Sequence, residues 1–152
     1  MEQNKAETKE IIQGDGNHSM RIERKFDAKR VDEIAKGSGS ESVKGAASYL
    51  SIPFIGGGRG FICEIIDNNA FFAGTMCKKH FRLYEMAVRK ESQKGGYGTA
   101  MLMRMKKLCR KSGVEKITCR TSKKETAINF YMKNGGRIVG EKGEDFEVEI
   151  PV

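Results

Sequence analysis

Hydrophobic and polar positions recur along the chain with two different periods, which predict strands and helices. Short apolar runs bounded by glycine or polar residues predict strands. Apolar side chains spaced three and four residues apart predict amphipathic helices. The predicted strands lie at about 20–24, 61–66, 71–77, 81–88, 114–121, 137–141 and 146–150, and the predicted helices at about 27–36, 42–50, 101–112 and 124–134.

The order of these elements predicts the fold class. A strand, a helix and a further strand follow one another from residue 81 to residue 121, so the two strands are expected to be parallel neighbours. Short turns join the other strands, which favours antiparallel pairs. We therefore predict an α/β (α+β) fold with a mixed, largely antiparallel central sheet flanked by helices. Residues 20–152 are expected to form one domain, preceded by a polar, weakly ordered extension at residues 1–19.

A glycine-rich loop, Gln93 to Gly98, separates a predicted strand from a predicted helix. Backbone N–H groups and the positive end of the helix dipole meet at such a junction, so it can bind a pyrophosphate. Gly96 and Gly98 are expected to adopt positive φ angles there. The loop is neither a dinucleotide fingerprint, because Met101 stands where that motif needs glycine, nor a P-loop.

Charge adds a second candidate surface. Residues 104–124 hold nine Lys or Arg and one acid, Glu115, which equals the net charge of +8 carried by the whole chain. Such a segment attracts anionic ligands, although a solvated helix face explains it equally well. No aromatic residue lies within it, which disfavours single-stranded nucleic acid as a partner.

The four cysteines form no C-x-x-C pair and the chain has only two histidines, so we expect free, buried thiols and no metal site. Residues 1–19 are polar, with no apolar segment behind their charges. That composition indicates neither an export signal nor a membrane partner, and we expect a cytoplasmic protein.

Three segments together resemble the GNAT family of acetyl-CoA-dependent N-acetyltransferases. Residues 83–88 look like the family's central strand, Gln93 to Gly98 matches its [RQ]-x-x-G-x-[GA] loop, and residues 127–135 are similar to its A-x-x-x-Y-x-K-x-G helix. The resemblance covers about residues 20–152 and is strong from 83 to 136. Gly95, an extra glycine in the loop, and Gly136, where the family has an aromatic residue, depart from the pattern.

The resemblance implies a sheet that splays between the family's fourth and fifth strands, here residues 83–88 and 114–121. It also implies that backbone groups of Met86 and Val88 bind the pantetheine arm of acetyl-CoA and that N–H groups from Lys94 to Thr99 bind the pyrophosphate. The residues expected at the cofactor are Met86, Ala87, Val88, Gln93, Lys94, Gly95, Gly96, Tyr97, Gly98, Thr99 and Asn129.

By the same resemblance, Tyr131 matches the family's general acid, since a phenol stays protonated at neutral pH and can protonate a departing thiolate. The alternative is an aromatic core residue. Glu85 is the expected general base, acting through water, and the alternative is a glutamate that faces solvent. Tyr84 and His80 are weaker candidates for the base.

The function that follows is an N-acetyltransferase that moves the acetyl group of acetyl-CoA to a primary amine by direct attack. The acceptor, a small molecule or a peptide, is expected to meet residues 27–60 and the hairpin 137–150, where the acids Glu141, Glu144 and Asp145 can attract a cation. The oligomeric state is expected to be a monomer or a homodimer. Two alternatives remain: a non-catalytic module that binds nucleic acid through residues 104–124, and an acyl-CoA sensor.

Overall fold

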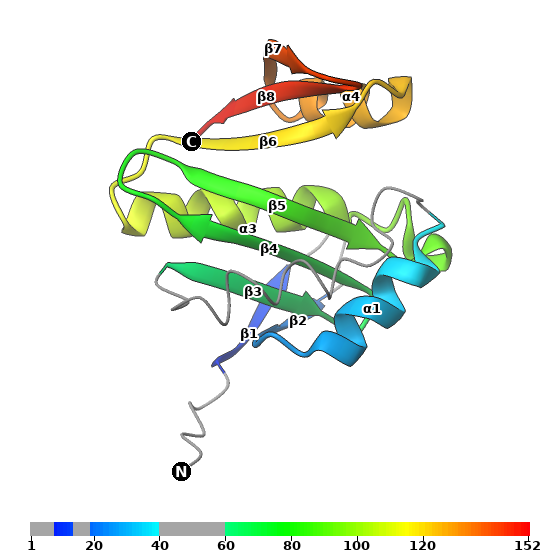
Figure 1. Ribbon diagram of the computed structural model, residues 1–152. Coiled ribbons are helices and arrows are strands. Elements are labelled where there is room, and N and C mark those ends of the chain that lie inside the picture. The colour runs from blue at the N-terminus through cyan, green and yellow to red at the C-terminus, as the bar shows by residue number, and fades with distance from the viewer. Residues whose placement is uncertain (1–7, 14–18, 40–59) are drawn as a thin grey trace.

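The computed structural model describes residues 8–13, 19–39 and 60–152 (Figure 1). In chain order its elements are β1 (Thr8–Gln13), β2 (Ser19–Arg24), α1 (Ala28–Gly37), β3 (Phe61–Ile66), β4 (Ala70–Met76), β5 (Phe81–Val88), the short 3₁₀ helix η2 (Lys90–Ser92), α3 (Tyr97–Lys111), β6 (Lys116–Ser122), α4 (Glu125–Lys133), β7 (Arg137–Lys142) and β8 (Asp145–Pro151). The helix predicted at 42–50 lies outside the described residues. No helix in the described part of the chain has the length and apolar character needed to cross a membrane.

The strands form one sheet in the order β1-β2-β3-β4-β5-β6-β8-β7. Every neighbouring pair is antiparallel except β5 and β6, which are parallel. The predicted mixed, largely antiparallel sheet flanked by helices is therefore confirmed, as is the parallel pairing of the strands on either side of α3. The last strand, β8, inserts between β6 and β7, an arrangement that the order of elements along the chain does not reveal.

The predicted extension at residues 1–19 contains a strand. Thr8–Gln13 pairs antiparallel with β2, with Thr8 opposite Arg24 and Gln13 opposite Ser19. The expectation of weak order is therefore wrong for these six residues. Their sequence, TKEIIQ, holds only two apolar side chains, so periodicity gave no strand signal there. The domain boundary at residue 20 stays a prediction.

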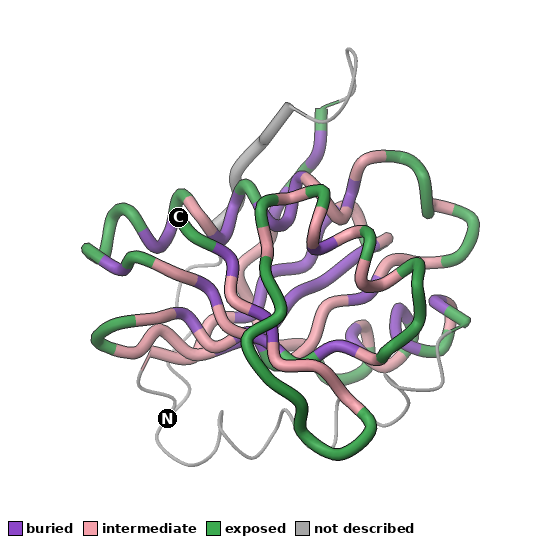
Figure 2. Tube along the Cα trace, turned by 90° about the horizontal axis from the view of Figure 1, so that it is seen from above, coloured by how far each residue is buried: buried purple, intermediate pink, exposed green. Residues whose placement is uncertain are grey.

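Neighbouring residues of a strand point to opposite faces of the sheet, so each face carries its own set of apolar side chains. One face is covered by α1 and the other by α3. On one face α1 packs Val31 and Ile34 against Ile65 and Phe71. Asp27 caps this helix by accepting a hydrogen bond from the backbone N–H of Arg30 at 3.2 Å. The helix ends and its buried side chains agree with the sequence prediction. Figure 2 shows the buried residues gathered along the central strands.

On the other face α3 contributes Met101, Leu102 and Met105 to the larger core, which also contains Phe72 and Phe81. These methionines are core residues, as their helical spacing predicts. Phe72 and Phe81 come from adjacent strands and meet edge to face, with ring centroids 6.3 Å apart. This core fixes α3, and with it the glycine loop from which the helix starts.

A cluster of three charged side chains lies on the face of the sheet that packs against the larger core. Glu64 on β3 is fully buried and accepts hydrogen bonds from Arg24 and Arg104, with the shortest contact to each guanidinium at 2.8 Å. Arg104 is itself only 4% exposed. The interpretation of the cations of residues 104–124 as a solvated helix face is therefore wrong for Arg104, because a carboxylate forty positions earlier compensates its charge inside the protein.

Candidate active site

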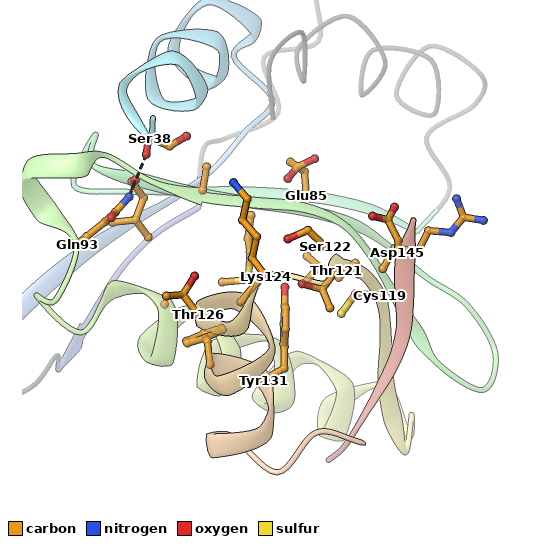
Figure 3. Close-up of a pocket in the computed structure, with 18 of the residues that line it drawn as sticks. Ser38, Glu85, Gln93, Cys119, Thr121, Ser122, Lys124, Thr126, Tyr131 and Asp145 are labelled. Carbon is orange, nitrogen blue, oxygen red and sulfur yellow. Dashed lines mark hydrogen bonds between the residues drawn. The ribbon is translucent and has the colours of Figure 1, made fainter. Parts of the chain in front are cut away.

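The parallel strands β5 and β6 separate soon after they begin. Only Phe81 and Arg82 of β5 are paired with β6, opposite Ile117 and Thr118. The rest of β5 diverges, which is the splay that the sequence predicts. A cavity of about 820 Å³ lies at this opening, and residues of β5, β6 and α4, together with the end of α1, line it. Figure 3 shows these side chains around the cavity.

The far half of β5 presents one backbone edge to the cavity. Its other edge is occupied, because Met86 pairs with Phe72 and Val88 with Ala70 of β4. Met86, Ala87 and Val88 all line the cavity. An exposed strand edge offers N–H and C=O groups to a ligand that carries amides along its length, as a pantetheine arm does.

The glycine loop ends at an uncapped helix N-terminus. Gly96 is the N-cap residue of α3, with a φ of 83° and no side chain to accept the first N–H groups. The first intrahelical hydrogen bond runs from the N–H of Ala100 to the carbonyl of Gly96, so the N–H groups of Gly98 and Thr99 precede the helical ladder. Lys94, at a φ of 71°, is the other loop residue with left-handed backbone. The loop therefore has the geometry of an anion site.

Gly98 has a different role from the one its sequence position predicts. No positive φ occurs there, so the prediction of left-handed backbone is right for Gly96 and wrong for Gly98. A Cβ at Gly98 would lie 2.9 Å from the ring of Phe130 on α4. The absence of a side chain lets α4 approach the loop, and this contact lies beside a second, smaller cavity that Lys94, Gly96, Thr99 and Phe130 also line.

The side chain of Gln93 holds the loop in place. Its amide nitrogen donates to the carbonyl of Ser38 at the end of α1 and to the carbonyl of Val88, both at 3.1 Å (Figure 3). The residue after it, Lys94, lines both cavities. Gln93 thus joins α1, β5 and the loop at the rim of the cleft.

Tyr97, the first residue of α3, connects the end of the glycine loop to the turn between β3 and β4. Its hydroxyl donates to a carboxylate oxygen of Asp67 at 2.8 Å and accepts from the amide of Asn69 at 3.1 Å. The ring is buried, so its side chain anchors α3 to the β3–β4 turn. Burial raises the pKa of this phenol, and Asp67 adds to the rise, while the hydrogen bond with Asn69 opposes it.

Two of the predicted cofactor residues do not line either cavity. Asn129 is exposed on α4, and Gly95 lies in the loop without facing the cleft. Gly136, where the resemblance shows a departure, is a point of close approach: its N–H donates to the carbonyl of Tyr131 at 2.8 Å, and a Cβ there would lie 2.8 Å from that oxygen. Glycine at 136 thus allows β7 to begin close to the end of α4.

Tyr131 extends from α4 into the cleft (Figure 3). Its ring is buried and packs edge to face on Phe130, with centroids 5.2 Å apart. Burial raises the pKa of Tyr131 well above the usual value of a phenol, and the neighbouring Cys119 and Glu85 add to the effect. The hydroxyl therefore holds its proton beyond the normal range of a tyrosine.

Glu85 stands across the cleft from α4, on β5, and is one of the residues that line the cavity (Figure 3). It is half-buried. Tyr84, the alternative candidate beside it, is 40% exposed and also lines the cavity, whereas His80 lies before the strand and does not. The structure therefore brings Tyr131 and Glu85 together at one cavity and leaves His80 outside it.

Of the three acids expected on the acceptor side, only Asp145 lines the cavity. It is the first residue of β8 and pairs with Ser122 at the end of β6. Glu141 instead forms an exposed ion pair with Lys123 at 3.1 Å. The acceptor side was also expected to include residues 27–60. Of the residues in this range that the structure describes, Ser38 and Gly39 at the end of α1 line the cavity.

The structure adds cavity residues that sequence reasoning missed. Cys119 is a buried free thiol beside Tyr131, and burial raises its pKa to about 11 while the hydrogen bond with Tyr131 opposes that rise. Lys124, assigned by sequence to a basic segment, extends into the cleft (Figure 3). The only sequence signal for either was its place on the elements that flank the splay, β6 and the start of α4.

A sheet that opens between two parallel strands, with an uncapped helix N-terminus at the mouth of the opening, suits a long ligand that carries a phosphate at one end. A family model described as the acetyltransferase (GNAT) family matches residues 38–136, and the chain belongs to this family. It is an acyltransferase with acetyl-CoA as its acetyl donor, as the sequence predicts. The enzymatic prediction thus prevails over the two non-catalytic alternatives.

Solved structures agree on the fold. The chain is 18% identical to the PaiA N-acetyltransferase of Thermoplasma acidophilum in complex with coenzyme A, with a TM-score of 0.67 over 86% of this chain and 99% of that chain. For the ribosomal-protein-S18-alanine N-acetyltransferase of Escherichia coli the identity is 15% and the TM-score 0.73, over 88% and 94% of the two chains. Ard1 of Thermoplasma volcanium is 17% identical to the chain, with a TM-score of 0.70 over 88% of this chain and 97% of that chain. No curated protein sequence matches the chain.

Proposed function

We propose that this protein transfers the acetyl group of acetyl-CoA directly to a primary amine held in the cleft between β5 and β6. The observation that carries the proposal is the convergence of Tyr131 and Glu85 on one cavity, whose far end meets the glycine loop. The free edge of β5 at Met86 and Val88 suits the pantetheine amides. The N–H groups of Gly98 and Thr99 suit the pyrophosphate.

Bound acetyl-CoA supplies an electrophilic thioester carbonyl and a thiol leaving group. Tyr131 then acts as the general acid, donating its hydroxyl proton to the sulfur as the carbon–sulfur bond breaks. Because burial raises its pKa, the hydroxyl is protonated at neutral pH before the transfer. Burial of the ring keeps bulk water away from the hydroxyl.

Glu85 acts as the general base on the acceptor. Most alkyl amines are protonated at neutral pH, so a proton must leave before the nitrogen forms its bond to the acetyl carbon. A half-buried carboxylate that faces the cavity can accept that proton through a water molecule and can attract the cationic amine first. Asp145 provides a second carboxylate on the same side for the rest of the acceptor.

The first test is thermal unfolding with increasing acetyl-CoA. We expect a saturable rise in the midpoint, equivalent to about 2.7 kcal/mol at a hundred times the dissociation constant. ADP should produce a smaller rise, since it lacks the pantetheine arm. Absence of any shift with acetyl-CoA would contradict the proposed site.

Gly98→Val tests the loop in the same assay. A side chain at this position meets the Phe130 ring at the junction of loop and α4, so we expect the acetyl-CoA dissociation constant to rise about tenfold, equivalent to 1.4 kcal/mol. Gly140→Val is the matched control, because a Cβ at Gly140 meets nothing within 4 Å. Equal dissociation constants for the two variants would contradict the role of the loop.

The pH dependence of kcat/KM offers a further test. The rate is expected to rise with pH as the acceptor amine loses its proton. Because burial raises the pKa of Tyr131, its proton is retained, and we expect no fall in rate below about pH 10. A descending limb with an apparent pKa near 8 would assign the acid to another group.

A further inference from the structure

The basic segment 104–124 does not form one surface in the folded protein. Arg104 is buried against Glu64. Lys116 and Lys123 form ion pairs with acids of β8 and β7, Glu149 and Glu141. Arg120 lies 3.9 Å from Glu147 on β8. Four of the nine cations of the segment therefore have acidic partners, and the remaining positive charge is divided among separate places on the protein.

A smaller group of cations remains exposed without an ion pair in the described part of the chain. Lys107, Arg110 and Lys111 lie on the outer side of the last two turns of α3. Lys78 and Lys79 are exposed in the turn between β4 and β5. Together these five residues form what we call the basic edge.

The topology brings the two parts of the basic edge to one end of the sheet. The first residue of β5, Phe81, pairs with Ile117 near the start of the parallel strand β6. The turn that precedes β5 and the connection from α3 that precedes β6 therefore lie at the same end, as Figure 1 shows. Glu115, an exposed acid in the connection between α3 and β6, offsets only one of the five positive charges, so the edge keeps a positive excess.

The basic edge is separate from the acetyl-CoA site. The glycine loop lies at the N-terminus of α3, whereas Lys107 and Lys111 lie near its C-terminus, which at 1.5 Å per residue is roughly 15–20 Å along the helix from its first residue. That separation exceeds the Debye length of about 8 Å at physiological ionic strength. The edge therefore does not serve to attract the phosphates of acetyl-CoA.

We propose that the basic edge binds the phosphate backbone of a double-stranded nucleic acid without reading its sequence. The edge consists of flexible cations, which suffice for phosphate contacts. It holds no aromatic residue to anchor a protein partner or to stack an unpaired base, which disfavours an acidic protein and a single strand. The proposal does not depend on the acceptor of the acetyl group.

Fluorescence anisotropy with a labelled 20-base-pair duplex, one of RNA and one of DNA, tests the proposal over about 50 to 200 mM salt. The wild-type protein should bind at least one duplex with a dissociation constant that rises steeply with salt. Lys107→Ala/Lys111→Ala removes two phosphate contacts, so the slope of log K against log salt should become less negative by about 1.8. Comparison of the two duplexes shows whether RNA or DNA is preferred.

Lys29→Ala/Lys142→Ala is the matched control, since it removes two exposed, unpaired lysines from α1 and β7 in the described part of the chain. It should keep the wild-type slope. Equal slopes for the two double variants would overturn the proposal, as would polyglutamate or single-stranded RNA that binds as tightly as either duplex. Both variants should retain the acetyl-CoA-dependent rise in thermal midpoint, so failure of the acetyltransferase proposal remains distinguishable from failure of this one.

Discussion

Replacement of Tyr131 by phenylalanine is expected to lower kcat by about 10²- to 10⁴-fold, the range typical of a lost general acid. Phenylalanine keeps the ring and its edge-to-face packing on Phe130 and removes only the hydroxyl. The thiolate must then leave without a positioned proton donor. The measurement is the rate of thiol release with any amine that the wild-type enzyme acetylates.

Affinity for acetyl-CoA separates this effect from a structural one. We expect the acetyl-CoA dissociation constant of Tyr131→Phe to stay close to the wild-type value, since the loop and the β5 edge are untouched. Tyr84→Phe is the matched control, because it removes a hydroxyl from a tyrosine that lines the same cavity and is 40% exposed. Equal turnover in Tyr131→Phe and the wild type would rule out Tyr131 as the acid.

The largest expected effect on stability is that of Glu64→Ala. Glu64 is fully buried and binds the guanidinium groups of Arg24 and Arg104. Alanine leaves the buried Arg104 without this carboxylate, and breaking a buried ion pair from one side costs about 3–5 kcal/mol. For a chain of 152 residues this corresponds to a fall of about 10 °C in the thermal midpoint.

Glu141→Ala provides the comparison for this measurement. Glu141 is 64% exposed and its ion pair with Lys123 lies in solvent, so its loss should cost less than about 1 kcal/mol. Chemical denaturation of the three proteins measures both free energies. A cost below about 1 kcal/mol for Glu64→Ala would show that the interior tolerates the uncompensated arginines.

Most elements could be predicted because their signal is local. The short apolar runs in residues 61–88 and the helical spacing of Met101, Leu102 and Met105 depend only on neighbouring residues. The strand Thr8–Gln13 could not be predicted from its own sequence, because it is defined by its pairing with β2. The position of β8 between β6 and β7 is likewise a consequence of packing.

The residues of the candidate site also form two groups: those that the sequence indicated and those that only the fold brings to the cavity. The glycine loop, the β5 residues and Tyr131 were found because they occur in short segments with a recognisable spacing. Cys119 and Lys124 were not, because only the splay of β5 from β6 brings them to the cavity. Gln93 was found for its place in the motif, whereas its hydrogen bond to the carbonyl of Ser38 joins residues 55 positions apart.

The sequence by itself determined the class of fold and located the glycine loop, since each depends on periodicity or spacing within a short stretch of chain. The acid role of Tyr131 is what the resemblance implies, and it stays a prediction. The tertiary structure decided which charges are buried, paired or exposed. Because arginine is charged, Arg104 was expected among the exposed cations of the chain. The carboxylate of Glu64, which is distant in the sequence, makes its burial favourable. The same folding brings the turn that carries Lys78 and Lys79 to the end of the sheet at which α3 ends, although these segments are far apart in the sequence.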